Sequence, residues 1–282
     1  MAKRRYSFDE EKISRFLKEG RGQGHGAQYS PWLTVQDVSS LGRATRIHGR
    51  KTNREHHLLS DIETSVFLLL DWSDAVIDIR EQYPLDREET RRIAAEMGVR
   101  HPFDTQGKCD IVMTTDFLVD VQTSNGPQLH VRSVKPAEEL DDSRTLEKLE
   151  IDRRYWVGKS DSWGLITERD VPMQRVKNLR WLHEMLVLDG MVAAYPDYWS
   201  DRCCRFLQCL SHAKGGTIKR FFQQLESTQG FAAGEGLTVL RHLGATKQLL
   251  INLDQPFTIN APLTTLEIAI VSTNSQQISG VA

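Results

Sequence analysis

The sequence predicts an α/β protein with two domains. The chain has 282 residues, about twice the ~150 residues of a typical domain. In its first part, segments with helical spacing alternate with short runs rich in β-branched residues, a pattern typical of a sheet flanked by helices. Near residue 168 the charged runs give way to Asp170-Val171-Pro172, and a new helical pattern begins. We therefore predict two domains, residues 1–168 and residues 169–282.

The first domain is predicted to contain a short amphipathic segment followed by three helices and four strands. Apolar residues at three- and four-residue spacings predict a helix over 60–72, and Glu63 falls inside this apolar stripe. The remaining predicted elements are helices over 88–97 and 144–156 and strands over 75–81, 110–121, 129–135 and 163–167.

The second domain is predicted to be a small α+β domain. Helical patterns cover 175–188, 217–225 and 236–243, and strand-like segments lie on either side of an Asp254-Gln255-Pro256 turn. Two helices followed by a hairpin are typical of a winged-helix-like domain. The adjacent Cys203 and Cys204 are most simply part of a buried helix.

Composition excludes several protein classes. Charged residues make up 26% of the chain and hydrophobic residues 39%, and no apolar run approaches the ~18 residues of a membrane span. The basic amino terminus lacks an apolar segment behind it, so we expect a cytoplasmic protein. The four cysteines (Cys109, Cys203, Cys204 and Cys209) form no C-x-x-C pair, which argues against a structural zinc site.

Charge along the chain is nearly balanced. Lysine and arginine number 36 against 38 acidic residues, a formal net charge of −2, so contact with nucleic acid has to come from local clusters. One such cluster lies in 42–54, which contains five basic residues and no acidic one: Arg43, Arg46, Arg50, Lys51 and Arg54. A solvated hairpin and a contact with the DNA backbone explain this cluster about equally well.

A hairpin between the strands over 110–121 and 129–135 would place Asp116 beside Lys135. If the turn is centred on Asn125-Gly126, Asp116 faces Lys135, and directly opposed residues point to the same side of the sheet. On its own, such a pair is most simply a cross-strand ion pair worth about 0.2–1 kcal/mol.

Glu63 also has two interpretations. Ser60-x-x-Glu63 matches a capping box, in which the carboxylate reaches back to the start of the helix. The combination of a helix carboxylate, a strand aspartate and a lysine on the neighbouring strand is less ordinary. Two carboxylates offer the hard oxygen ligands that Mg²⁺ prefers, and an ammonium near a metal can orient a water or help to deprotonate it.

Six segments together resemble one known family. They are PWLTVQDV, HLLSDIE, DIREQYPL, TTDFLVD, VKP and RTLEKLEIDRRYW, which occur in order over about the first 165 residues. They are similar to segments of TnsA, the endonuclease subunit of heteromeric (TnsABC-type) bacterial transposases. The second half of the chain resembles the family mainly in size and in its predicted elements.

The resemblance implies a restriction-endonuclease-like core of the PD-(D/E)xK type, with a central mixed sheet flanked by helices, followed by a winged-helix-like domain. It also implies that Glu63, Asp116 and Lys135 are catalytic. Glu63, Asp116 and the backbone carbonyl of Val134 would then hold one or two Mg²⁺ ions, for which we expect Mn²⁺ to substitute. Ser133 stands where the family usually has Glu or Gln, so water would complete one metal site.

The implied reaction is hydrolysis of a DNA phosphodiester, with a metal-bound water attacking in line. In the family, this subunit nicks the 5′ strands at transposon ends during cut-and-paste transposition, while a TnsB-type transposase cuts and joins the 3′ ends. A TnsC-type ATPase regulates the assembly. Because the chain has no strongly basic face, we expect little cleavage without these partners.

Two other functions remain open on the sequence. One is a stand-alone restriction-like nuclease with its own DNA specificity. The other is a non-catalytic assembly subunit that bridges TnsB, TnsC and DNA, in which Ser133 marks decay of the metal site. The presence of Glu63, Asp116 and Lys135 counts against such decay.

Overall fold

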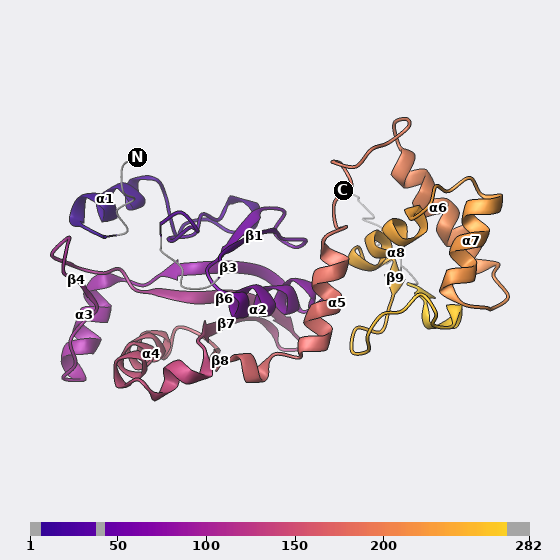
Figure 1. Cartoon of the computed structure of the whole chain (residues 1–282). Helices are drawn as coiled ribbons and strands as arrows, with labels where there is room; N and C mark the ends of the chain where they lie inside the picture. The colour runs from indigo at the N-terminus through magenta and orange to yellow at the C-terminus, as the bar shows by residue number, and fades with distance from the viewer. Residues whose placement is uncertain (1–6, 38–42, 270–282) are drawn as a thin grey trace, which may run out of the picture. The chain divides into compact units, whose positions relative to one another are not determined.

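The computed structural model describes residues 7–37 and 43–269, which form two compact units, 1–171 and 172–282 (Figure 1). The first unit is a mixed α/β structure around a four-stranded sheet, and the second is mostly helical. Among the described residues, no helix has both the length and the apolar character needed to cross a membrane.

The central sheet of the first unit has the order β3-β6-β7-β8. Strands β3, β6 and β7 pair antiparallel, whereas β7 and β8 pair parallel, so the sheet is mixed. A separate two-stranded hairpin, β1 with β2, precedes it. The bounds are β1 Thr45–His48, β2 Glu55–Leu58, β3 Val76–Pro84, β6 Thr114–Thr123, β7 Gly126–Val134 and β8 Ser162–Ile166, with a small pair β4 Phe103–Asp104 and β5 Cys109–Asp110.

Helices flank this sheet. The bounds are α1 Glu10–Lys18, α2 Asp61–Trp72, α3 Arg87–Glu96 and α4 Ser143–Trp156. Helices α3 and α4 share an apolar cluster with the sheet residues Leu118 and Val131. Helix α2 packs against β2 and β3, where the Phe67 ring centroid lies 4.4 Å from that of His56. The predicted order of helices and strands in this half is confirmed, with boundaries that differ by a few residues.

The register of the β6–β7 hairpin differs from the prediction. Leu118 faces Val131 and Asp120 faces Leu129, whereas a turn at Asn125-Gly126 would have placed Leu118 opposite Ser133. The pairing ends with Thr123 opposite Gly126, so the two turn residues are 124 and 125. Because side chains alternate with a period of two, this two-residue shift leaves each side chain on its predicted face.

The second unit contains α5 Met173–His183, α6 Tyr198–Ser211, α7 Ile218–Thr228, α8 Glu235–Ala245, and a short antiparallel pair, β9 Leu249–Leu250 with β10 Glu267–Ile268. Its core lies among α6, α7 and α8 and includes Phe206, Phe221 and Leu240. The predicted helix over 175–188 is too long, because α5 ends at His183. Cys203 is half-buried and Cys204 is exposed on α6, so the prediction that this cysteine pair is buried is wrong.

Candidate active site

Glu63 lies in the first turn of α2 and is 6% exposed. The hydroxyl of Ser60, the N-cap residue, accepts a hydrogen bond from the Glu63 N–H at 3.1 Å and donates one to the Glu63 carboxylate at 3.0 Å. The Leu59 N–H donates to the other carboxylate oxygen at 2.9 Å. The carboxylate reaches back to the start of the helix as predicted, but its backbone donor is Leu59, not the Ser60 N–H of a standard capping box. These contacts fix the orientation of the carboxylate.

Asp116 and Lys135 meet where the β6–β7 pairing ends. The Lys135 Nζ lies 3.1 Å from Oδ2 of Asp116, and the Val134 N–H donates to the same oxygen at 2.6 Å. The Lys135 Nζ also donates to the Val134 carbonyl at 2.8 Å. Asp116 is 8% exposed and the side chain of Lys135 is 32% exposed, so the carboxylate is largely shielded from water and the ammonium is partly shielded.

The structure brings Glu63 close enough to this pair for the charges to interact. Burial and, to a smaller extent, the negative charge of Asp116 raise the pKa of Glu63 to about 7, against the opposing effects of the Leu59 N–H, Lys135 and Ser60. A buried carboxylate beside a second carboxylate favours either a proton or a metal ion between them. The three predicted catalytic side chains are thus assembled from α2, β6 and the end of β7.

Lys135 is held in its charged form. Burial lowers its pKa, but the charge of Asp116, the hydrogen bond to Asp116 and the charge of Glu63 outweigh burial, so that the net shift is upward. The ammonium therefore carries a full positive charge near neutral pH. In this state it can orient a phosphate or a water and offset negative charge.

The donors at this place fit a hard divalent cation. Glu63 and Asp116 supply carboxylate oxygens, and Val134 supplies a backbone carbonyl, which are the ligand types that Mg²⁺ and Mn²⁺ prefer. Oδ2 of Asp116 accepts two hydrogen bonds, whereas Oδ1 accepts none from the part of the chain that is described. That oxygen is free to bind a metal.

Ser133 points away from this set of donors. Its side chain is buried, and its hydroxyl donates to Oδ2 of Asp152 on α4 at 2.5 Å. Asp152 also accepts from the Thr115 hydroxyl on β6 and from the indole N–H of Trp163 on β8. Burial raises the pKa of Asp152 against these three hydrogen bonds. A serine directed at α4 cannot take the position of the usual Glu or Gln ligand without turning its side chain.

Sequence reasoning missed Asp152 and Gln82, which both contact the site. The signal for Asp152 was its spacing, three residues after Leu149 and four before Trp156, both of which are buried on α4. Gln82 donates to Oε2 of Glu63 at 3.3 Å. Nothing in the local sequence marks Gln82, because its partners lie on distant segments.

A second cluster of metal-ligand type contains His25, Asp78 and Asp120, whose ligand atoms lie within 4.8 Å of one another. The Arg80 guanidinium donates to Asp120 at 2.7 Å and lies 3.6 Å from Asp78. The buried positive charge of Arg80 offsets one of the two negative charges and repels a metal ion. We interpret this cluster as an ion-pair network.

The four predicted DNA-binding residues lie in different environments around the β1–β2 hairpin. Arg46 is exposed, whereas Arg50 and Lys51 are half-buried and donate to Asp71 through their backbone N–H groups. Arg54 is buried and makes a two-fold contact with Glu81, with N···O distances of 2.8 and 2.6 Å. Because its guanidinium is occupied inside the protein, the expectation that Arg54 contacts DNA is not supported.

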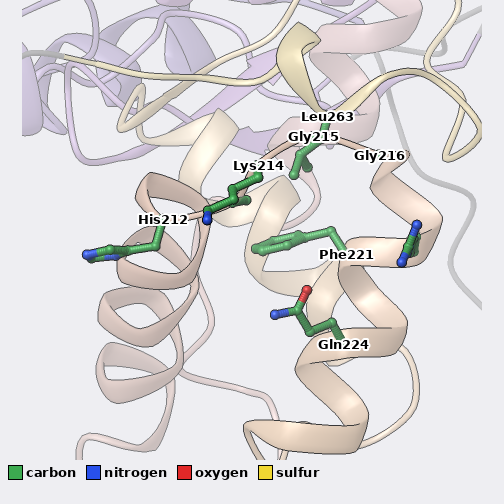
Figure 2. Close-up of a pocket in the computed structure, with 9 residues that line it drawn as sticks. His212, Lys214, Gly215, Gly216, Phe221, Gln224 and Leu263 are labelled. Atoms are coloured by element: carbon green, nitrogen blue, oxygen red, sulfur yellow. The ribbon is translucent and has the colours of Figure 1, made fainter.

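The second unit has an open hollow of about 470 Å³ between the end of α6 and the start of α7 (Figure 2). Its polar lining consists of His212, Lys214, Arg220 and Gln224, around the apolar side chains of Phe221 and Leu263. Among the residues that the structure describes, no acidic one lines it. Lys214 and Arg220 are exposed and form no ion pair within the described ranges, so the hollow is suited to an anionic group.

Comparisons with known proteins identify the family of this chain. Residues 73–168 match the family model described as TnsA-like endonuclease N terminal, and residues 170–253 match TnsA endonuclease C terminal. The chain is 51% identical over 185 residues to the transposon Tn7 transposition protein TnsA of Escherichia coli, covering 66% of this chain and 67% of that protein. The chain therefore belongs to the TnsA family of transposition endonucleases.

Proposed function

We propose that this chain is the Mg²⁺-dependent endonuclease subunit of a heteromeric transposase and nicks the 5′ strands at transposon ends. Glu63, Asp116 and Lys135 are its catalytic residues, and the Val134 carbonyl completes the protein ligands to the metal. The observation that carries the proposal is the meeting of two buried carboxylates and a charged lysine, brought together by three separate elements. We also propose a cytoplasmic location, because the DNA substrate of this reaction lies there in bacteria.

Each side chain has a distinct part in the proposed hydrolysis. When bound, the divalent cation supplies Lewis-acid stabilisation of the negative charge that develops on the phosphate and lowers the pKa of a water. Asp116 would hold the cation through the carboxylate oxygen that accepts no hydrogen bond from the described residues, and Glu63 would hold it through a carboxylate that the contacts at the start of α2 keep in place. Lys135 acts as a fixed positive charge. Its raised pKa makes it a poor base, so we assign it to orienting the water and stabilising phosphate oxygens.

A strand-specific nicking assay with TnsB-type and TnsC-type partners tests this proposal. Asp116→Ala and Lys135→Ala are expected to reduce 5′-strand cleavage by more than about 100-fold, while 3′-strand joining continues. Asp120→Asn is the matched control because it lies on the same strand but belongs to the Arg80 ion-pair network. Unchanged 5′ cleavage by Asp116→Ala would exclude the proposed site.

The same assay separates the alternatives. Efficient cleavage without partners would favour a stand-alone restriction-like nuclease. Assembly with TnsB, TnsC and DNA without any metal-dependent nicking would favour a non-catalytic bridging subunit. We expect neither result, because the carboxylates and the lysine converge and the chain carries a net charge of only −2.

We further propose that the catalytic part, residues 1–168, has a restriction-endonuclease-like core, and that residues 169–282 form a winged-helix-like domain for assembly and DNA contact. Helices α6 to α8 followed by the β9–β10 pair support the second assignment. Every residue of α8 is buried or half-buried, so α8 cannot insert into a DNA groove as a recognition helix. The basic hollow at α7 is the phosphate contact that we propose instead, together with Arg46, Arg50 and Lys51 of the first domain.

A further inference from the structure

Gln82 has an unusual backbone conformation for a buried strand residue. Its φ is 49°, and its exposed fraction is 2%. Four other non-glycine residues of the described chain have positive φ, namely Asn53, Lys108, Asp197 and Lys247, and each of them is exposed or half-buried. Residues other than glycine avoid this region because Cβ crowds the following carbonyl. Strain of this kind persists where the surroundings hold it and is concentrated at functional sites.

The strained position lies directly beside the proposed active site. On β3, Glu81 pairs with Phe117 and Tyr83 pairs with Thr115, so Gln82 lies opposite Asp116. The Trp32 N–H donates to the Gln82 carbonyl at 3.2 Å. Strand β3 is the edge strand of its sheet, and a backbone group from a distant segment thus satisfies this carbonyl.

The side-chain amide of Gln82 joins two elements of the site. Its Nε2 donates to Oε2 of Glu63 at 3.3 Å, and its Oε1 accepts from the Thr114 hydroxyl at 3.1 Å. Thr114 lies two residues before Asp116 on β6. The opposite orientation of the amide would bring its oxygen against the carboxylate, so the hydrogen-bond network determines the orientation.

We propose that Gln82 is a positioning residue of the metal site, whose left-handed backbone aims its carboxamide between the helix that carries Glu63 and the strand that carries Asp116. This inference depends on the proposed nuclease function. Gln82 and the Leu59 N–H both donate to Oε2 of Glu63, whereas Oε1 accepts only from the Ser60 hydroxyl in the described part of the chain. Oε1 therefore keeps a lone pair for a metal while Gln82 holds the other oxygen. Outer hydrogen bonds of this type commonly change metal affinity 10- to 100-fold.

Two variants separate positioning from simple filling of space. Gln82→Gly removes the amide and relieves the positive φ, whereas Gln82→Met keeps the volume and the strain but removes the amide. Lys108→Gly is the matched control, because it relieves a positive φ at an exposed turn residue away from the site. The readouts are the Mn²⁺ concentration at half-maximal thermal stabilisation of the full-length protein, measured without DNA, and the Mn²⁺ dependence of nicking with partners.

We expect both Gln82 variants to need about tenfold more Mn²⁺ in both measurements, while Lys108→Gly behaves as wild type. If Gln82→Gly does not fold, Gln82→Met still tests the proposal. If a folded variant without the amide needs the same Mn²⁺ concentration for half-maximal stabilisation as wild type, the proposed role of Gln82 is wrong. A wild-type protein that shows neither stabilisation by Mn²⁺ nor nicking would instead remove the proposed function, so the two failures are distinguishable.

Discussion

At the scale of single residues, Glu63 shows that a structural role and a chemical role can belong to one side chain. The same carboxylate caps α2 through Leu59 and Ser60 and is held near Asp116. The cap contributes rigidity, which a metal ligand needs. The capping box is therefore not an alternative to the proposed site but the means by which its geometry is held.

The raised pKa of Glu63 predicts a dependence of metal-free stability on pH. Its folded value of about 7 lies above its ordinary value of 4.5, so the folded chain keeps a proton that the unfolded chain releases between these values. Stability from this group is complete below pH 4.5 and is lost as pH rises to about 7, by at most about 1.4 kcal/mol per pH unit. Thermal unfolding of wild type and Glu63→Gln in chelator, from pH 5 to 8, checks this. Glu63→Gln is expected to lose less stability than wild type as pH rises. If stability falls equally with pH in both proteins, Glu63 is not the group responsible.

The proposed catalytic residues could be predicted from the sequence, but the residues that hold them in place could not. Glu63, Asp116 and Lys135 stand in a recognisable order, because each lies on an element with a clear periodicity. Gln82 and Asp152 look like ordinary polar residues, and only their long-range partners reveal their roles. Similarly, the exposure of Arg54 could not be judged without knowing that Glu81 lies beside it.

At the scale of elements, the β6–β7 turn explains why the predicted register was wrong. A turn at Asn125-Gly126 would make Pro127 part of the closing hydrogen-bonded pair, where it lacks the N–H that is required. In the structure Gly126 closes the turn with Thr123, and Pro127 lies opposite Gln122 at the following position of the ladder. The penalty against proline at the closing pair outweighs the preference for an Asn-Gly turn.

The contacts of Asp152 predict that α4 holds the two strands of the site together. Removing this carboxylate leaves the buried hydroxyls of Thr115 and Ser133 and the indole N–H of Trp163 without their acceptor. We expect Asp152→Ala to lower the free energy of unfolding by about 2–4 kcal/mol and to reduce nicking. Glu147→Ala, which removes a surface ion pair on the same helix, should change stability by less than about 1 kcal/mol. Denaturant unfolding measures the free energy of unfolding of both variants. Equal losses would contradict the role of Asp152 in holding the strands together.

At the scale of the whole molecule, charge is divided unevenly between the two units. Residues 1–171 carry 26 basic and 30 acidic side chains, a net charge of −4, and residues 172–282 carry 10 and 8, a net charge of +2. The unit with the proposed catalytic site is thus poorly suited to attract DNA by itself. This division supports a nuclease whose substrate is delivered by partners and held in part by the second unit.

The basic hollow of the second unit gives this division a direct test. We expect the double variant Lys214→Ala, Arg220→Ala to bind duplex DNA about tenfold more weakly at moderate salt. The slope of the logarithm of the binding constant against the logarithm of the salt concentration should become about 2 less steep, because two phosphate contacts are lost. The matched control is Lys177→Ala, Arg205→Ala, which removes the same charge from exposed positions outside the hollow. Fluorescence anisotropy with Ca²⁺ in place of Mg²⁺ measures binding without cleavage. If the two double variants bind equally, only the overall charge of the unit matters and the hollow is not a specific phosphate contact.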